Sequence, residues 1–148
     1  MMTKNSLLRL SIGSDLEQVD LVGIVIQSTL EQVAFDPDEI HWLVMSVREA
    51  VINAILHGNR EDAEKRVRVK VDLEGPDLVV RVEDEGQGFD PEGLPDPTAP
   101  ENLLRPSGRG IFMMRQFADS IEYSFPSKLG TVVTMRKRLA TPQEEELE

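Results

Sequence analysis

The alternation of hydrophobic and polar residues predicts one strand and two long helices in the first part of the chain. Residues 6–12 alternate as a strand does, and residues 16–33 then follow a helical period. Asp36 can cap a second helix over residues 37–57. Gly58 comes directly after this pattern and is expected to end the helix as its C′ residue.

The second part of the chain has the two-residue period of strands, interrupted by one long loop. The segments RVRVKVDL and LVVRVE alternate around a Gly-Pro-Asp turn, so they predict a hairpin with one face in the core. Residues 86–107 contain five prolines and three glycines, which indicates a long loop of the kind that often serves as a lid. The remaining predictions are a short helix at 111–118, a strand at 120–125, a turn at 127–130 and a strand at 131–137.

This order of elements predicts an α+β fold, a two-layer sandwich with a mixed, mostly antiparallel sheet and helices on one face. A length of 148 residues matches one domain, which is expected to span residues 1–138. Residues 139–148 form an acidic tail that is expected to be disordered, because four Glu after a Pro bury too little surface to offset ordering.

The composition argues against several classes of protein. A net charge of -11 disfavours direct nucleic-acid binding, because phosphate contacts need clustered Lys and Arg. Without cysteine there is no disulfide, thiolate nucleophile or cysteine-based metal site. No apolar run approaches the ~20 residues of a membrane span, and the first residues do not resemble a signal peptide. The sequence therefore predicts a cytoplasmic protein with no membrane contact.

A narrow polar strip runs along the predicted second helix. Ser46, Glu49, Asn53 and His57 fall within a sector only ~80° wide, bordered on both sides by apolar side chains. An ordinary surface helix has a broader polar face, so the strip suggests the lining of a pocket. A hydrogen bond between Glu49 and Asn53 on a partly wet face explains the strip equally well. The helix alone leaves both interpretations open.

Two glycine motifs flank the long loop. The first, DEGQG at 84–88, follows a predicted strand, but the next residues cannot form the helix that a dinucleotide-binding fold requires. On its own it is more simply a turn. The second, SGRG at 107–110, opens a predicted helix, where glycine N–H groups and the helix N-terminus suit a phosphate. A hinge with an N-cap fits this second motif equally well.

Taken together, these features resemble the GHKL ATP-binding superfamily. Glu-x3-Asn-x3-His-Gly on a helix, Asp-x-Gly-x-Gly-Phe after a strand and Gly-x-Gly opening a helix correspond in order to its N, G1 and G2 boxes. Gly130-Thr131 takes the place of a weaker last motif, and the resemblance covers residues 36–138. Within the superfamily, REAVINAILHGN and SGRGIFMMRQFAD are most similar to the anti-sigma-factor serine/threonine kinases of bacterial partner-switching systems.

The resemblance implies how ATP and Mg²⁺ would be held. Asp84 would accept a hydrogen bond from the adenine amino group with help from Thr131, while Gly86 and Gly88 would leave room for the base. Asn53 would bind Mg²⁺, a hard cation that prefers oxygen ligands. The residues expected at the phosphates are Gly108, Gly110, Arg105 and Arg109.

The resemblance also implies a function. The protein would be an ATP-dependent serine/threonine kinase and anti-sigma factor, with Glu49 as the general base and His57 as a packing residue at the helix end. It would phosphorylate a STAS-type anti-anti-sigma protein and bind a sigma factor, and a homodimer is a further expectation. The alternative is a nucleotide-gated regulator that binds a partner without kinase activity; the intact Glu49 favours the kinase. A histidine-kinase fragment would need a dimerisation helix pair that the sequence lacks.

Overall fold

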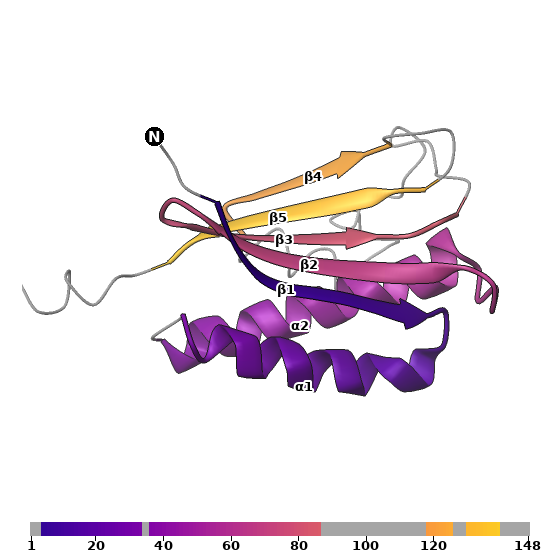
Figure 1. Cartoon of the computed structure of the whole chain (residues 1–148), viewed down its shortest axis with the longest axis horizontal. Coiled ribbons are helices and arrows are strands. Elements are labelled where there is room, and N and C mark those ends of the chain that lie inside the picture. Colours follow the sequence, from indigo (N-terminus) through magenta and orange to yellow (C-terminus); the bar gives the residue numbers. More distant parts are fainter. Residues whose placement is uncertain (1–3, 34–35, 87–117, 126–129, 140–148) are drawn as a thin grey trace, which may run out of the picture.

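The computed structural model describes residues 4–33, 36–86, 118–125 and 130–139. In this part of the chain a five-stranded sheet lies over two helices (Figure 1). The strands are β1 (Lys4–Gly13), β2 (Arg66–Glu74), β3 (Asp77–Glu83), β4 (Ser120–Ser124) and β5 (Val132–Arg138), in the spatial order β1-β2-β3-β5-β4. Each neighbouring pair is antiparallel. The predicted two-layer α+β sandwich is confirmed.

The two predicted helices are present, but each is divided into an α-helix and a shorter helical turn of another type. A single 3-10 turn, η1 (Leu16–Gln18), leads into α1 (Val19–Leu30). The second helix, α2 (Pro37–Asn53), begins at Asp36, whose side chain accepts a hydrogen bond from the Asp38 amide at 2.9 Å, as an N-cap does. It continues as a π-helical turn, η2 (Ala54–Gly58). Thus both helices begin where the sequence predicts, and the second ends at Gly58.

The conformation of Gly58 differs from the prediction. A C′ glycine has a positive φ angle, but the φ angle of Gly58 is not positive. The residues with positive φ after η2 are instead Arg60 (52°) and Glu61 (58°). The reason for a glycine at position 58 therefore lies in its surroundings, described below.

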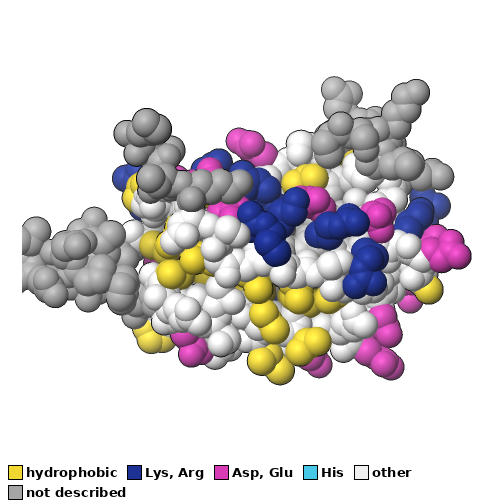
Figure 2. Space-filling model, in the orientation of Figure 1, with side chains coloured by type: hydrophobic (Ala, Val, Ile, Leu, Met, Phe, Trp, Pro, Cys, Tyr) yellow, Lys and Arg dark blue, Asp and Glu magenta, His cyan; other side chains and the backbone are white. Residues whose placement is uncertain are grey.

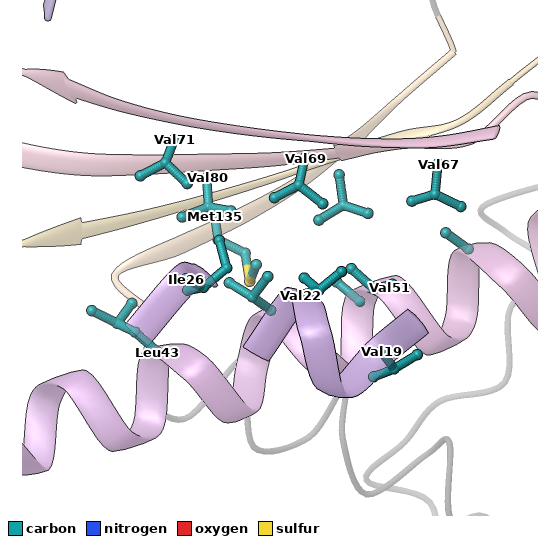
Figure 3. Close-up of a cluster of buried hydrophobic side chains, with 14 of the residues drawn as sticks. Val19, Val22, Ile26, Leu43, Val51, Val67, Val69, Val71, Val80 and Met135 are labelled. Carbon is teal, nitrogen blue, oxygen red and sulfur yellow. The ribbon is translucent and has the colours of Figure 1, made fainter. Parts of the chain in front are cut away.

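The hydrophobic core fills the space between the sheet and the helices (Figure 3). Alternate residues of β2 point into it, so Val67, Val69 and Val71 have no exposed surface, while Arg68 and Lys70 lie on the opposite face. From the helices, Val22 and Ile26 of α1 and Val47 and Val51 of α2 are equally buried. Each such side chain contributes ~1.5–3 kcal/mol by leaving water, so the two-residue period of β2 is enough to fix which face packs on the helices.

The open face of the sheet carries a network of ion pairs. Asp72, whose side chain is fully buried, lies 2.8 Å from Arg9 and 3.3 Å from Arg81. Glu74 continues the network to Arg81 at 3.3 Å and Arg136 at 3.2 Å, which connects four strands. Figure 2 shows Lys and Arg side chains gathered over the sheet half of the molecule.

Four predictions concern residues that are almost entirely outside the described part of the chain. One is the turn at 127–130, of which only Gly130 is described. The others are the long loop at 86–107, the short helix at 111–118 and the acidic tail at 139–148, of which only Gly86, Ala118 and Leu139 are described. Among the helices of the described ranges, none combines the length and the hydropathy needed to cross a membrane.

Candidate functional site

Asp84 lies just beyond the end of β3, where backbone groups fix its carboxylate. Its Oδ1 accepts hydrogen bonds from the amides of Gly86 at 3.0 Å and Thr131 at 3.2 Å. Its own amide donates to the Thr131 carbonyl at 3.0 Å, and the Gly130 amide donates to the Gly86 carbonyl. The other oxygen, Oδ2, accepts none of these bonds and lies against Gly58. One carboxylate oxygen is therefore held by two amides, and the second makes no hydrogen bond to the described residues.

Glycine is required at positions 58 and 86 because two backbone segments nearly touch there. A Cβ atom at Gly58 would overlap the carboxylate of Asp84, and one at Gly86 would lie 2.5 Å from the carbonyl carbon of Gly58. Gly130 has a φ of 95°, which favours glycine, and a Cβ there would lie 2.7 Å from the Asp84 carbonyl oxygen. These glycines bring the end of η2, the turn after β3 and the start of β5 into contact.

The residues of the polar strip on the second helix differ in whether their polar groups find hydrogen-bond partners. The Ser46 hydroxyl donates to the Trp42 carbonyl at 2.8 Å, so the helix itself satisfies this buried group. Oε1 of Glu49 and Oδ1 of Asn53 are buried without any hydrogen-bond partner in the described residues. The interpretation of a mutual Glu49–Asn53 hydrogen bond is therefore wrong for these atoms. His57 is exposed rather than packed, which corrects its expected role at the helix end.

Three side-chain oxygens in the described residues are buried and unpaired: Glu49 Oε1, Asn53 Oδ1 and Thr131 Oγ1. Leaving a buried polar group without a hydrogen bond costs ~1–3 kcal/mol, so each needs an explanation. All three residues are among those predicted to bind Mg-ATP or act on it. A ligand that supplies their missing partners would explain why the fold retains them.

The ionisation of two carboxyl groups is shifted at this site. Burial raises the pKa of Glu49 from 4.5 to about 7. Burial also raises the pKa of Asp84, although the hydrogen bonds from Gly86 and Thr131 oppose this effect. A carboxyl group with a pKa near neutrality can accept a proton and release it again at physiological pH, as a general base must.

The donor atoms also fit a magnesium ion bound together with phosphates. Within the described ranges, no group of three or more His, Cys, Asp or Glu residues could hold a metal. Magnesium rarely needs such a group, because it binds one or two protein oxygens and completes its shell with phosphate and water. The unpaired Oδ1 of Asn53 is an oxygen of this kind.

Sequence reasoning placed Glu49, Asn53, Asp84, Gly86 and Thr131 in the site, and the structure describes all five. The structure brings three of them together, because the backbone amides of Gly86 and Thr131 both donate hydrogen bonds to the Asp84 carboxylate. The other predicted residues, Gly88, Arg105, Gly108, Arg109 and Gly110, lie outside the described residues.

Sequence reasoning missed the roles of Gly58 and Asn59. Gly58 was expected only to end the helix, and its contact with Asp84 was not predicted. Asn59 is only 1% exposed and accepts a hydrogen bond from the amide of Glu85, next to Asp84. Their position directly after the Glu-x3-Asn-x3-His pattern was the available signal.

The sequence matches a known family along most of its length. The family model for the histidine kinase-like ATPase domain covers residues 12–137. The chain belongs to this family. Membership of an ATPase-domain family implies nucleotide binding, in agreement with the resemblance to the GHKL superfamily.

Among its relatives are anti-sigma F factors. That of Bacillus subtilis (strain 168) is 33% identical over 121 residues, which cover 79% of this chain and 82% of the relative. That of Clostridium perfringens (strain SM101 / Type A) is 28% identical over 138 residues, covering 90% and 97% respectively. The family is therefore represented by proteins of similar length with an anti-sigma function.

Solved structures show the same fold. The RsbU and RsbW domains of Rv1364c from Mycobacterium tuberculosis match with a TM-score of 0.65 and 21% identity, over 91% of this chain and 33% of the solved chain. The histidine kinase domain of a blue-light activated kinase from Erythrobacter litoralis matches with a TM-score of 0.58 and 16% identity, over 86% and 62%. At these identities the comparisons show the fold alone.

Proposed function

We propose that this protein is an ATP-dependent serine/threonine kinase and anti-sigma factor. In this proposal it phosphorylates a STAS-type anti-anti-sigma protein and binds a sigma factor as its other partner. The observation that carries the kinase is a pair of buried oxygens on Glu49 and Asn53, one helical turn apart on α2, that have no hydrogen-bond partner among the described residues. The names of the anti-sigma F relatives support the choice of partners.

Adenine recognition is assigned to Asp84. Its Oδ2 would accept a hydrogen bond from the exocyclic amino group of adenine, while the buried hydroxyl of Thr131 supplies a second polar contact. Guanine has a keto oxygen where adenine has the amino group, so it would set one acceptor against another. The site should therefore bind ATP and ADP in preference to GTP.

Phosphoryl transfer is assigned to the α2 residues. Asn53 would hold Mg²⁺, which would offset the negative charge of the ATP phosphates. Glu49 would take the proton from the serine or threonine hydroxyl of the partner while that oxygen forms a bond to the γ-phosphorus. The bond from the γ-phosphorus to the bridging oxygen breaks, and ADP leaves with the electron pair. A pKa of about 7 lets Glu49 accept the proton and later return it to water.

The test combines the purified protein with Mg-ATP and the STAS protein encoded nearest to it. Mass spectrometry of the STAS protein should show the mass of one phosphate on a serine or threonine, and none without Mg²⁺ or with GTP in place of ATP. ATP binding without phosphorylation of any STAS protein would instead favour the nucleotide-gated regulator. A cytoplasmic location and a homodimer remain predictions.

A further inference from the structure

Asn59 is a buried residue that connects four segments of the fold at the edge of the candidate site. Its Nδ2 donates to the Ser14 hydroxyl at 2.9 Å and to the Arg66 carbonyl at 3.0 Å. Its Oδ1 accepts from the Glu85 amide at 2.7 Å. One side chain thus ties the end of the second helix to the chain after β1, the start of β2 and the turn after β3.

The bond to Glu85 acts directly on Asp84. The Glu85 amide and the Asp84 carbonyl belong to one planar peptide group, so fixing the direction of this N–H also fixes the ψ angle of Asp84. On its other side, Asp84 is held by the backbone of Thr131. The Thr131 carbonyl accepts a hydrogen bond from the Asp84 amide, and the Thr131 amide donates to the Asp84 carboxylate. The Gly86 amide also donates to Oδ1 of this carboxylate. Asn59 therefore adds a constraint on the backbone that follows Asp84 to the hydrogen bonds that Thr131 and Gly86 make with the carboxylate itself.

The nearby chain reinforces this arrangement without replacing it. The Glu85 carboxylate accepts a hydrogen bond from the Arg66 amide, and the Ser14 hydroxyl donates to the Lys65 carbonyl at 2.6 Å. These bonds join the start of β2 to its neighbours, but Asn59 is the described residue whose side chain binds the peptide group adjoining Asp84. The two functions of its amide are separable, because Oδ1 faces Glu85 and Nδ2 faces Ser14 and Arg66.

We infer that Asn59 is a positioning residue for nucleotide selectivity. Through Oδ1 it orients the Asp84 carboxylate toward the adenine amino group, and through Nδ2 it stabilises the fold. The inference rests on the proposed function, since it needs a nucleotide at Asp84. It goes further by assigning selectivity to a residue that does not touch the base.

The experiment separates the two functions with three variants. Asn59→Ala removes both the acceptor oxygen and the N–H donors. Asn59→Asp keeps an acceptor oxygen for the Glu85 amide but loses the N–H donors. Ser14→Ala removes one acceptor of Nδ2 and leaves the hydrogen bond to Glu85 intact. Calorimetry gives the dissociation constants of ATP and GTP, and urea unfolding gives stability. All three variants should be less stable than the wild type, because each loses buried hydrogen bonds.

Selectivity should follow the acceptor oxygen alone. Asn59→Ala should weaken ATP binding by ~10-fold and shrink the GTP-to-ATP ratio of dissociation constants by a similar factor, as expected when a charge-assisted hydrogen bond loses its alignment. Ser14→Ala and Asn59→Asp should keep the wild-type ratio. If Asn59→Ala does not fold, hydrogen exchange at the Glu85 amide provides the second measurement: it should be slow in the wild type and Asn59→Asp without nucleotide.

The outcomes are distinguishable. Three results would overturn the positioning role while leaving the kinase proposal intact. The first is a folded Asn59→Ala protein with the wild-type ratio of GTP and ATP dissociation constants, and the second is an Asn59→Asp protein that has lost this ratio. The third is a Glu85 amide that exchanges rapidly in the wild type. A wild type that binds neither nucleotide would overturn both.

Discussion

Replacing Glu49 with Gln is expected to increase stability at alkaline pH and to slow partner phosphorylation strongly. Burial raises the pKa of Glu49 to about 7, so the folded protein holds this proton more tightly than the unfolded chain does. The stability that this group contributes is complete below pH ~4.5, falls between pH ~4.5 and ~7, and is constant above. Gln is neutral throughout, so the variant avoids this loss.

The size of the effect follows from the pKa difference. A rise of the pKa from 4.5 to about 7 changes the free energy of unfolding by ~3 kcal/mol for a fully shielded carboxyl, because a pKa difference of one corresponds to ~1.4 kcal/mol. Because the side chain of Glu49 is only half-buried, solvent screening reduces this to ~1–2 kcal/mol. Changing a carboxyl to an amide has its own pH-independent effect, so the informative quantity is how much the stability difference between variant and wild type grows from pH 5 to pH 8.

The assay pairs unfolding with phosphoryl transfer. Urea unfolding followed by circular dichroism at pH 5 and pH 8 should show the variant gaining ~1–2 kcal/mol on the wild type over this interval. The matched control, Glu64→Gln, changes an exposed carboxylate and should show much less. Phosphorylation of the STAS protein should fall by ~10²–10⁴ in Glu49→Gln, while ATP binding remains. In the wild type, kcat/KM should rise with pH to a plateau above about 7.

Two results would refute this reasoning. A stability difference that is the same at both pH values would mean that the folded protein does not hold Glu49 protonated near neutrality. Phosphorylation at the wild-type rate would remove Glu49 from the chemistry, whatever its pKa.

Three further variants test the rest of the site. Gly58→Ala should weaken ATP binding by at least ~10-fold, because the added Cβ overlaps the Asp84 carboxylate, whereas Gly13→Ala adds a Cβ in open space and should leave the dissociation constant unchanged in the same titration. Thr131→Val removes a buried hydroxyl that has no hydrogen-bond partner among the described residues, so urea unfolding should show no loss of stability while calorimetry shows weaker ATP binding. Asn53→Ala should remove the dependence of ATP affinity on Mg²⁺, measured by titrating ATP with and without the ion.

Those parts of the fold that depend on local sequence patterns were predictable. In β2, valines alternate with charged residues, and this period specifies both a strand and its buried face. Asp36 and Pro37 mark the start of α2 by satisfying and fixing the first turn. The order of the strands was not predictable in this way, because β5 lies between β3 and β4 and that placement depends on contacts between distant segments.

The same distinction applies to the site. Glu49 and Asn53 share a helical face, so their spacing was readable from the sequence. Gly58 and Asn59 have partners that lie far along the chain, at Asp84 and Ser14. The local rule that glycine ends helices placed the helix end correctly but assigned Gly58 the wrong conformation. It could not reveal the contact with Asp84, because a close approach to a distant carboxylate leaves no trace in neighbouring residues. Ser46 belongs to the polar strip, but its own helix satisfies it.

The topology of the sheet explains how Asp84, the residue proposed to bind adenine, is held in place. Because β5 pairs with β3, Thr131 just before β5 lies beside Asp84 just after β3, and the Asp84 amide donates a hydrogen bond to the Thr131 carbonyl. The helix end approaches from the other side through Gly58 and Asn59. A carboxylate held in this way loses little conformational freedom when it binds a ligand, so most of the hydrogen-bond energy to the base contributes to affinity. Discrimination between ATP and GTP should therefore originate here rather than in the loop between the two glycine motifs.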